Sequence, residues 1–454
     1  MNKFESENKM NKVDLTKGNV LKVLVTLALP IMGSSLLQFT YNLVDMLWVG
    51  GLGSNAVASI GSSSFFIGLG YSINAFVVIG TGIKVAHSIG RKDNKAVDEY
   101  ISAGVILNAI VAAVYSLILI FFGKNFIGFL NIRNSGVERE AYIYLAINAP
   151  ILFFSFFNTL FIRIFNSFGI NKSALYISAI GVIINLILDP IMIYVLKLGV
   201  TGAALGTLIA NAVMFIFFIK KSLNLYNFDF KNGLNYIKLK EITVLGLPMS
   251  FQRVLFTLVN ILLARIVGSF GADAIAAQKI GLQIESVVYM VVGGLNGAIA
   301  GFVGQNFGAK KYDRINKGYN TAIGIGIVYA LSVSLLFIFT PEILVRLFIR
   351  EDNTIFIASN YLRIIGYSQI FATIEMISNG VFTGFGVPKI PALISIIFTI
   401  LRIPLALILT KFYDVNGIWI GISISSILKG IVAYLIYKFK IWKVYKNVRC
   451  DSVT

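Results

Sequence analysis

The stretch LALPIMGSSLLQFTYNLVDMLWVGGLG, residues Leu27–Gly53, is apolar enough to cross a bilayer as a helix, yet it holds Asp45 well inside. A charged side chain at such a depth costs about 2.5–3.5 kcal/mol on insertion scales, so an acid here indicates a function. Gln38, Tyr41 and Asp45 are spaced by three and four residues, which places them on one helical face. Pro30, early in the same helix, can bend it. A structural acid that is hydrogen-bonded to a neighbouring helix is the alternative interpretation.

The composition of the whole chain agrees with a membrane protein. Of its 454 residues, 57% are hydrophobic and 13% are charged, against about 25% charged in soluble domains. The net charge of +18 does not indicate nucleic-acid binding, because most Lys and Arg residues lie in short segments between long apolar runs. The chain has one cysteine, Cys450, and one histidine, His87, so we expect neither an internal disulfide nor a histidine-rich metal site. No cofactor is expected.

The apolar runs are long and continuous, which predicts helices rather than the alternating strands of a β-barrel. The sequence predicts twelve spans, at about residues 20–49, 56–84, 97–122, 139–166, 173–196, 201–219, 241–268, 274–302, 318–340, 355–383, 391–412 and 416–440. Every second loop is rich in Lys and Arg, and both termini belong to this set. The positive-inside rule therefore predicts a multi-pass protein of the cytoplasmic membrane with both termini in the cytoplasm.

The two halves of the chain repeat each other. The segment from Pro30 aligns with the segment from Pro248 at a shift of 218 residues, and Gly53/Gly271 and Lys92/Lys310 are among the identities. FGINK at residues 168–172 aligns with FGVPK at residues 385–389. We therefore expect an all-α fold of two six-helix lobes, residues 1–219 and 241–454, joined by a cytoplasmic linker at residues 220–240. Because each half has an even number of spans, a pseudo-two-fold axis along the membrane normal should relate the lobes, as in transporters with parallel repeats.

Two acids break this repeat. Asp45 aligns with Leu263, and Asp189 in the fifth span aligns with Ile403. The scaffold therefore does not need an acid at either position, which favours a functional role for both.

Polar neighbours accompany the second acid. Asn185 lies one helical turn before Asp189, Pro190 follows it directly, and Thr207 lies in the next span. The proline frees a backbone carbonyl and suits a helix break at an ion site. Carboxylate, amide and hydroxyl oxygens suit Na⁺, while two neighbouring buried carboxylates suit a shared proton. The sequence leaves H⁺ and Na⁺ open, with Thr207 slightly favouring Na⁺.

At these residues the sequence resembles the MATE (multidrug and toxic compound extrusion) family of prokaryotic type. The resemblance covers nearly the whole chain, and its carriers are DLTKGNVLKVLVTLALP, YNLVDMLWVGGLG, NLILDP and the GRK and GAKK loops. It implies two six-helix lobes, a central cavity, and export driven by entry of H⁺ or Na⁺. It also implies a first-lobe cation site at Asp45, Asn185, Asp189 and Thr207. By the same resemblance Gln38 and Tyr41 line the cavity, and Pro30 marks a helix that bends as the site changes its charge.

The second lobe departs from one pattern of that family. Some members carry an acid eight residues after the Leu-Pro of the seventh span, where this chain has Phe256. Glu285 and Glu375 are the acids that this lobe offers instead, as possible second-lobe sites. For Glu285 the alternative is a buried ion pair with Arg253 or Lys279, the usual way to tolerate a charge at this depth.

The favoured function is secondary active efflux by cation antiport, with two lobes in alternating access. The expected substrates are small, amphiphilic and cationic, and the expected state is a monomer in the lipid bilayer. A lipid-linked oligosaccharide flippase of related architecture is the alternative, because basic residues for a pyrophosphate are present at Arg163, Arg253, Arg265, Lys279 and Arg402. An enzyme is not expected, since no HExxH, GxSxG or CxxC pattern occurs.

Overall fold

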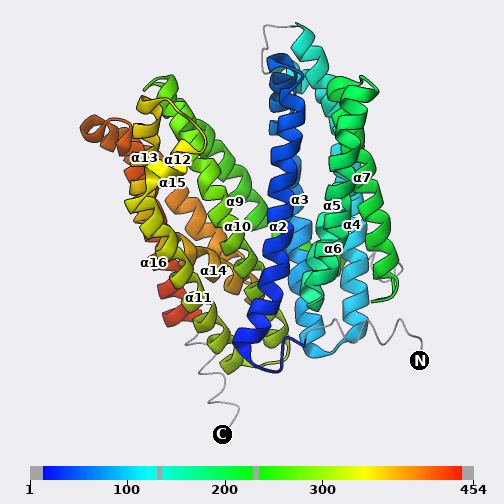
Figure 1. Cartoon of the computed structure of the whole chain (residues 1–454). Helices are drawn as coiled ribbons and strands as arrows, with labels where there is room; N and C mark the ends of the chain where they lie inside the picture. The colour runs from blue at the N-terminus through cyan, green and yellow to red at the C-terminus, as the bar shows by residue number, and fades with distance from the viewer. Residues whose placement is uncertain (1–13, 130–134, 229–234, 442–454) are drawn as a thin grey trace. The chain divides into compact units, whose positions relative to one another are not determined.

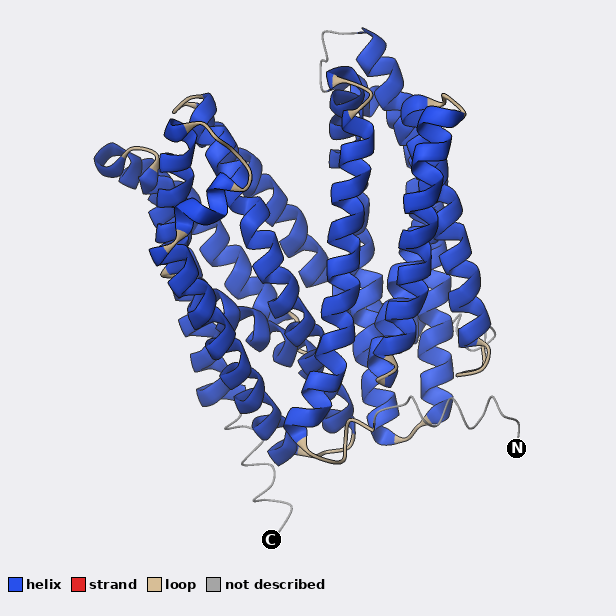
Figure 2. Cartoon of the chain, in the orientation of Figure 1, coloured by secondary structure: helices blue, strands red, loops and turns tan. Residues whose placement is uncertain are grey.

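The computed structural model describes residues 14–129, 135–228 and 235–441, and within these ranges it is helical with short connections and no strand (Figure 2). The predicted inter-lobe linker lies partly, and the tail with Cys450 wholly, outside the described residues. The helices of the first half are α2 (Val20–Gly50), α3 (Ser54–Arg91), α4 (Asn94–Phe129), α5 (Ser135–Phe168), α6 (Asn171–Pro190) with the π-helical turn η1 (Ile191–Val195), and α7 (Gly199–Ser222). Figure 1 shows their course.

The second half follows the same order. Its helices are α9 (Tyr236–Gly268), α10 (Ala272–Gly308), α11 (Tyr312–Phe339), the short α12 (Pro341–Arg346), α13 (Asp352–Gly366), α14 (Gln369–Phe385), α15 (Lys389–Tyr413), and α16 (Asn416–Ile436) with η2 (Tyr437–Ile441). Eleven helices of the described chain are long and apolar enough to cross a membrane. The predicted tenth span is divided at Tyr367–Ser368 into α13 and α14, each too short to count alone. The all-helical polytopic fold is thus confirmed.

The backbone carries the predicted repeat. Positive φ angles recur at paired positions: Gly53 and Gly271 before α3 and α10, Lys92 and Lys310 after them, and Gly169 and Gly386 before α6 and α15. Glycine adopts a positive φ without the Cβ clash that other residues meet, which explains its identity at four of these six turns. The two halves therefore share their turn geometry as well as their helix order.

Contacts divide the chain into two compact units. Unit 1 contains Gly33–Ser250, and unit 2 contains Asp14–Met32 with the chain from Phe251 onward. Each repeat's first helix is therefore shared: α2 changes unit two residues after Pro30, and α9 changes unit two residues after Pro248. The lobes predicted above are defined by the repeat and the units by contacts, so the predicted lobe boundaries stay a prediction.

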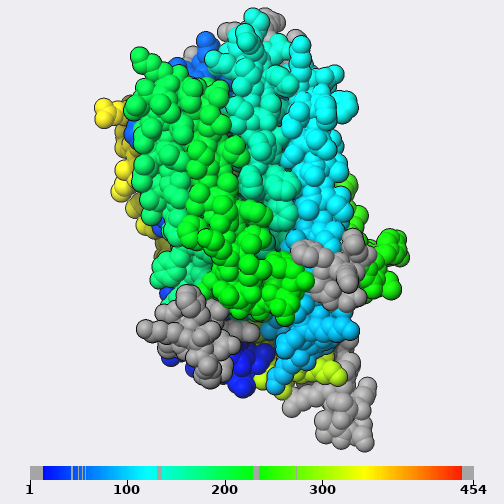
Figure 3. All heavy atoms as spheres, turned by 90° about the vertical axis from the view of Figure 1, so that its right-hand side faces the viewer, coloured from blue at the N-terminus to red at the C-terminus, as the bar shows by residue number. Residues whose placement is uncertain are grey.

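In unit 1, α3 packs against α4 and α5, and α7 packs against α5 and α6. Phenylalanines of α5 and α7 form much of the core: the rings of Phe161 and Phe218 lie 6.0 Å apart and those of Phe165 and Phe218 lie 5.4 Å apart. Figure 3 faces this unit, with α4 in cyan and α7 in green on the surface. Exposed apolar side chains such as Phe121, Phe122 and Phe217 suit a lipid-facing surface.

In unit 2, α14 packs against α10, α11 and α16, and α15 packs against α16. The residues before α2 are fixed to this unit through their backbone. Leu15 is fully buried, and its carbonyl oxygen accepts hydrogen bonds from Asn306 Nδ2 at 3.0 Å and from Arg314 Nε at 3.2 Å. Arg314 Nη1 also donates to the carbonyl of Gly18 at 2.7 Å. The beginning of α2 is therefore anchored at α10 and α11.

The beginning of α9 is anchored in unit 1 in a comparable way. The hydroxyl of Ser250 donates to the backbone carbonyls of Ser72 and Ile73 on α3. Gly246 lies so close to the backbone of Phe76 that an added Cβ would meet its carbonyl oxygen. The absence of a side chain at Gly246 therefore permits the close approach of α9 to α3.

We expect Ser250→Ala to lower the stability of unit 1 by about 0.5–1.5 kcal/mol, because a buried hydrogen bond to the α3 backbone is lost. Thermal unfolding in detergent measures the change. The matched control is Thr257→Ala, since the exposed Thr257 hydroxyl bonds only within its own helix, to the carbonyl of Arg253. Equal melting temperatures for Ser250→Ala and wild type would contradict this role of Ser250.

Candidate functional site

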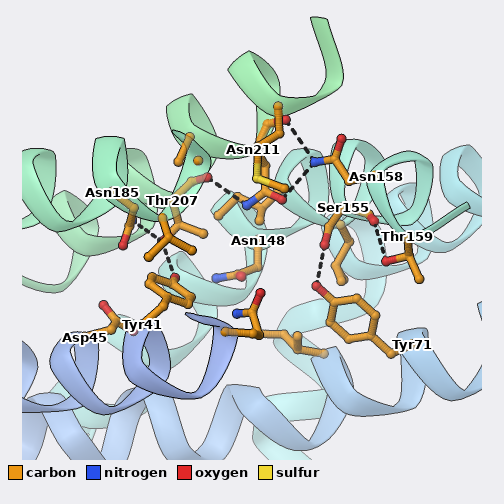
Figure 4. A pocket seen from close by; sticks show the side chains of 18 of the residues that line it. Tyr41, Asp45, Tyr71, Asn148, Ser155, Asn158, Thr159, Asn185, Thr207 and Asn211 are labelled. Atoms are coloured by element: carbon orange, nitrogen blue, oxygen red, sulfur yellow. Dashed lines mark hydrogen bonds between the residues drawn. The ribbon is translucent and has the colours of Figure 1, made fainter. Parts of the chain in front are cut away.

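Three helices of unit 1 bring the predicted first-lobe residues together. Tyr41 and Asp45 are one turn apart on α2, Asn185 and Asp189 are one turn apart on α6, and Thr207 lies on α7. Figure 4 shows Tyr41, Asp45, Asn185 and Thr207 pointing toward one another. The spacing of four residues put each pair on one helical face, and the packing of α6 against α7 brings Thr207 to them.

Hydrogen bonds fix this group. Asn185 Nδ2 donates to Asp189 Oδ1 at 2.9 Å and to Thr207 Oγ1 at 3.3 Å. Thr207 Oγ1 donates to the carbonyl of Ala203 at 3.0 Å, and it lies 3.1 Å from the hydroxyl of Tyr41. A threonine hydroxyl has one proton to donate, so Tyr41 is the donor in its contact with Thr207. Both lone pairs of Thr207 Oγ1 are thus in use.

The carboxyl groups of Asp45 and Asp189 lie close enough to affect each other electrostatically. Three oxygens of this group are buried and have no hydrogen-bond partner in the described part of the chain: Asp45 Oδ1, Asn185 Oδ1 and Asp189 Oδ2. All three are acceptors only, and buried acceptors are almost always satisfied in native structures. A proton or a hard cation would satisfy them, so the residues fit such a ligand. A cluster of three or more His, Cys, Asp or Glu side chains does not occur among the described residues.

Pro190 does not break α6 as the sequence suggested. The helix instead widens directly after it into the π-helical turn η1, in which the Leu196 amide donates to the carbonyl of Ile191 at 2.9 Å. Proline cannot donate its own backbone hydrogen bond, and such wide turns are frequent at functional sites. The local change in pitch adjoins Asp189, whose side chain is fully buried.

Sequence reasoning missed Gly206 on α7. A Cβ at this residue would lie 2.4 Å from Asp189 Oδ1, so the carboxylate fits there because the side chain is absent. Gly202, one turn earlier, faces the carbonyl of Met192 with a Cβ distance of 2.6 Å. Small residues spaced by four, such as Gly202 and Gly206, are typical of closely packed helices in membranes. This spacing was the sequence signal that could have predicted the close approach of α7.

A cavity of about 490 Å³ in unit 1 opens beside the group. Its polar lining residues include Gln38, Tyr41, Asp45, Tyr71, Tyr144, Asn148, Asn158, Asn185, Thr207 and Asn211. Gln38 and Tyr41 thus lie where the resemblance placed them, although their roles stay predictions. The sequence analysis did not identify three further lining residues, Asn148, Asn158 and Asn211. The signal that could have identified them is the same as for Asn185, namely an amide side chain inside an apolar span. Asn158 Nδ2 donates to Asn211 Oδ1 at 3.2 Å (Figure 4).

Pro30 is not among the residues that line this cavity. It precedes Asp45 by fifteen residues, which is about 22 Å along a helix, and it belongs to the part of α2 that groups with unit 2. Its predicted influence on the site must therefore act through α2 itself, and it stays a prediction.

The second-lobe acids Glu285 and Glu375 have separate partners. The alternative of an ion pair between Glu285 and Arg253 or Lys279 is wrong for the described residues, where its carboxylate accepts hydrogen bonds from neutral groups of Tyr289, Tyr361 and Gln369. Glu375 Oε1 accepts from Ser395 at 3.3 Å and from Asn379 at 3.5 Å. Tyr289 lies one turn after Glu285 on α10, so the spacing of four residues was a signal for it, whereas Tyr361 and Gln369 lie on α13 and α14 and give no signal along α10.

Comparisons with known proteins show which family and fold the chain matches. A family model described as MatE matches residues 30–191 and 248–408, one region in each half. The probable multidrug resistance protein YpnP of Bacillus subtilis is 26% identical over 450 residues, covering 96% of this chain and 99% of that protein. The probable multidrug resistance protein NorM of Thermotoga maritima is 25% identical over 448 residues, covering 93% of each. A solved structure of a mutant of VcmN, a MATE transporter of Vibrio cholerae, has a TM-score of 0.88 at 21% identity, covering 93% of this chain and 98% of that chain, which shows a common fold.

Proposed function

Because the chain belongs to the MatE family, we propose that it exports small, amphiphilic, cationic molecules in exchange for H⁺ or Na⁺. The observation that carries the proposal is the group of three buried, unpartnered oxygens on Asp45, Asn185 and Asp189 in the described chain. Two neighbouring carboxylates that form no ion pair with a described basic residue need a cation between them. The adjoining cavity offers polar and aromatic side chains to a substrate.

The geometry favours a proton in this arrangement. Thr207 Oγ1 already has three hydrogen-bonding neighbours, so it offers no free lone pair to a metal ion. The remaining three oxygens are few for Na⁺, whereas one proton can be shared between Asp45 and Asp189. Binding of Na⁺ would require the Thr207 hydroxyl to turn away from Tyr41 or Asn185.

In the proposed mechanism, α2 transmits the charge state of the site. Its residues from Gly33 group with unit 1 and its earlier residues with unit 2, where Arg314 and Asn306 anchor the chain before it. Uptake of a cation by Asp45 and Asp189 changes the force on the Tyr41–Asp45 turn, and the shared helix carries this change to unit 2. The cation's different affinity for the two states supplies the free energy of alternating access.

The cellular location and the oligomeric state belong to the same proposal. The Lys- and Arg-rich loops support a cytoplasmic membrane location with both termini in the cytoplasm, and we propose a monomer. The flippase alternative is not favoured: its basic residue Arg402 is buried and donates to Ser425 Oγ at 3.1 Å and Ser426 Oγ at 3.3 Å. That guanidinium is not presented to a pyrophosphate.

Expression in a bacterial host that lacks its own exporters tests the function. We expect cells with the wild-type chain to tolerate cationic dyes and to accumulate less of them than cells with the empty vector. Collapse of the cation gradients with an ionophore should remove the difference. Equal accumulation in the two strains, with the protein present in the membrane, would contradict the proposal.

We expect Thr207→Val to weaken efflux by about 5–150-fold, because a coupling free energy of about 1–3 kcal/mol is typical of linked sites. The change leaves Tyr41 and Asn185 without the hydroxyl that joins them. Thr207→Ser keeps that hydroxyl and should stay near wild type. Initial rates of dye efflux measure both variants, and equal rates for the Val and Ser variants would remove Thr207 from the site.

A further inference from the structure

The end of α2 and the π-helical turn η1, both in unit 1, meet close to the two acids of the candidate site. Trp48 lies three residues after Asp45 on α2, and Tyr194 lies five residues after Asp189 in η1. The hydroxyl of Tyr194 donates a hydrogen bond to the backbone carbonyl oxygen of Trp48 at 2.6 Å, and the two rings meet edge to face with their centroids 6.1 Å apart. These contacts join the two segments that carry the acids, and the mechanism proposed above does not use them.

The carbonyl of Trp48 needs a partner from outside its own helix. Because α2 ends at Gly50, this carbonyl is among the last four of the helix, which have no amide partner within it. A continued helix would direct the amide of Leu52 at Trp48, but that amide donates to the carbonyl of Val49 at 3.0 Å instead. The Tyr194 hydroxyl therefore satisfies an acceptor that the end of α2 leaves open.

Gly51 leaves the room in which the Tyr194 hydroxyl lies. A Cβ added at Gly51 would lie 2.3 Å from that hydroxyl oxygen and 3.4 Å from the Cζ atom of the ring. The φ angle of Gly51 is not positive, so its backbone does not require a glycine. The absence of a side chain at this residue is thus explained by the approach of Tyr194 to the carbonyl of Trp48.

An apolar cluster holds the same junction together. Val49 of α2, Ile193 of η1 and Ala203 of α7 are buried in it, and Trp48 packs against them. The carbonyl of Ala203 accepts the hydrogen bond from Thr207, a residue of the candidate site. The end of α2 is therefore packed against the two elements that adjoin the site.

One polar atom of the junction is not satisfied. Nε1 of Trp48 is buried and has no hydrogen-bond partner in the described part of the chain. A buried donor without an acceptor raises the free energy of the arrangement that contains it. The hydrogen bond and the ring contact of Tyr194 stabilise that same arrangement, so they determine how firmly the end of α2 is held at η1.

We propose that Tyr194 is a positioning residue of the cation site: its hydroxyl holds the end of α2 against η1 and thereby keeps the carboxylate of Asp45 beside that of Asp189. The hydrogen bond stabilises the arrangement in which both carboxylates contact one cation, so its loss weakens cation binding. The other titratable side chains that act on the two acids are Tyr41 and Tyr144, which are neutral at physiological pH. The effect on transport rests on the function proposed above, whereas the attachment of α2 to η1 does not.

Trp48 itself reports on this junction. Replacing Trp419 and Trp442 by phenylalanine leaves Trp48 as the single tryptophan of the chain. The fluorescence of this purified protein is followed across a pH series in K⁺ buffer and across an Na⁺ series at constant pH. We expect one of the two series to show a transition that Asp189→Asn removes, and the midpoint of this transition measures the affinity for the coupling cation.

Tyr194→Phe in this reporter protein keeps the ring and removes the hydroxyl. We expect the midpoint to move to a cation concentration about 2- to 12-fold higher, the factor that one hydrogen bond contributes to an equilibrium. If the cation is H⁺, the midpoint moves to lower pH, because carboxylates that are further apart share a proton less well. Tyr176→Phe is the matched control: that tyrosine of α6 is 66% exposed, and its replacement should leave the midpoint unchanged.

Gly51→Ala tests the same hydrogen bond from the other side. Its Cβ displaces the Tyr194 hydroxyl, so its midpoint should move in the same direction. Tyr194→Phe removes the oxygen that this Cβ meets, so the double variant should move the midpoint no further than the larger single shift. Either variant alone decides the outcome if the other does not fold.

The midpoint separates positioning from a merely structural role. A side chain that only stabilises the fold would lower the melting temperature of its variant without moving the midpoint. Trp and Tyr are also common as anchors at membrane interfaces, and with that role alone Tyr194→Phe and Gly51→Ala would leave the midpoint unmoved. That result, or shifts that multiply in the double variant, would overturn the proposal and leave the proposed function standing. A reporter protein without a transition, or with one that survives Asp189→Asn, would contradict the proposed function and this proposal with it.

Discussion

Replacement of Asp189 by asparagine is expected to reduce gradient-driven efflux by about 5–150-fold, the range that corresponds to a coupling free energy of about 1–3 kcal/mol. The amide keeps the shape of the side chain, but it cannot take up a proton or balance a cation. It would also direct an N–H group toward Asp45, which locks the pair in one state. Dye accumulation in an exporter-deficient host, normalised to the amount of protein in the membrane, measures the effect.

The partner residue gives a sharper version of this experiment. We expect Asp45→Asn to lose efflux to a similar extent and the double variant to lose no more than the worse single variant, because residues that act as one site are not additive. The matched control is Asp352→Asn, since that carboxylate is exposed and lies in a surface pair with Arg346 at 3.6 Å. Independent, multiplying losses from Asp45→Asn and Asp189→Asn would contradict a shared cation.

The second large effect is expected at Gly206, which carries no charge. In Gly206→Ala the new Cβ would lie 2.4 Å from Asp189 Oδ1, and Asn185 holds that oxygen at 2.9 Å. Either the carboxylate leaves Asn185 or α7 moves away from α6, and overpacking of this kind costs about 1–3 kcal/mol. We expect efflux to fall strongly while the protein stays in the membrane.

Gly61→Ala is the control for this change. An added Cβ at Gly61 on α3 meets nothing within 4 Å, so alanine there should be harmless and should favour the helix by up to about 1 kcal/mol. Efflux rates and melting temperatures of the two variants separate a local effect on Asp189 from a general effect of alanine. Unchanged efflux in Gly206→Ala would show that the position of the Asp189 carboxylate does not matter.

The helices and the grouping of the first-lobe residues were predictable because strong signals are local in sequence, whereas the role of these residues as a cation site stays a prediction. Long apolar runs fixed the spans, and spacing by four residues put Tyr41 with Asp45 and Asn185 with Asp189. The repeat identified both acids as departures from the scaffold, since their counterparts are Leu263 and Ile403. The mutual electrostatic influence of the two carboxyl groups was not predictable, because it depends on how residues of different helices are brought together in the fold.

Other features depend on contacts between distant helices. An ion pair of Glu285 with Arg253 or Lys279 was the alternative because pairing is the usual way to tolerate a buried charge, yet Tyr361 and Gln369 from α13 and α14 are among its partners. The interruption at Tyr367–Ser368 lies in an apolar run without proline, so hydropathy predicted one continuous span. The division of α2 and of α9 between the two units also depends on packing alone. Pro30 and Pro248 lie two residues before the positions at which the unit changes.

The central claim is that Asp45 and Asp189 bind the cation whose entry drives export. Cation movement across proteoliposomes is its most direct test, with wild type and Asp45→Asn reconstituted at equal density and a cationic dye added on one side. We predict that the dye drives a counterflow of H⁺ or Na⁺ through the wild type and that this counterflow is absent in Asp45→Asn. Dye-driven cation flux through Asp45→Asn at the wild-type rate would contradict the account.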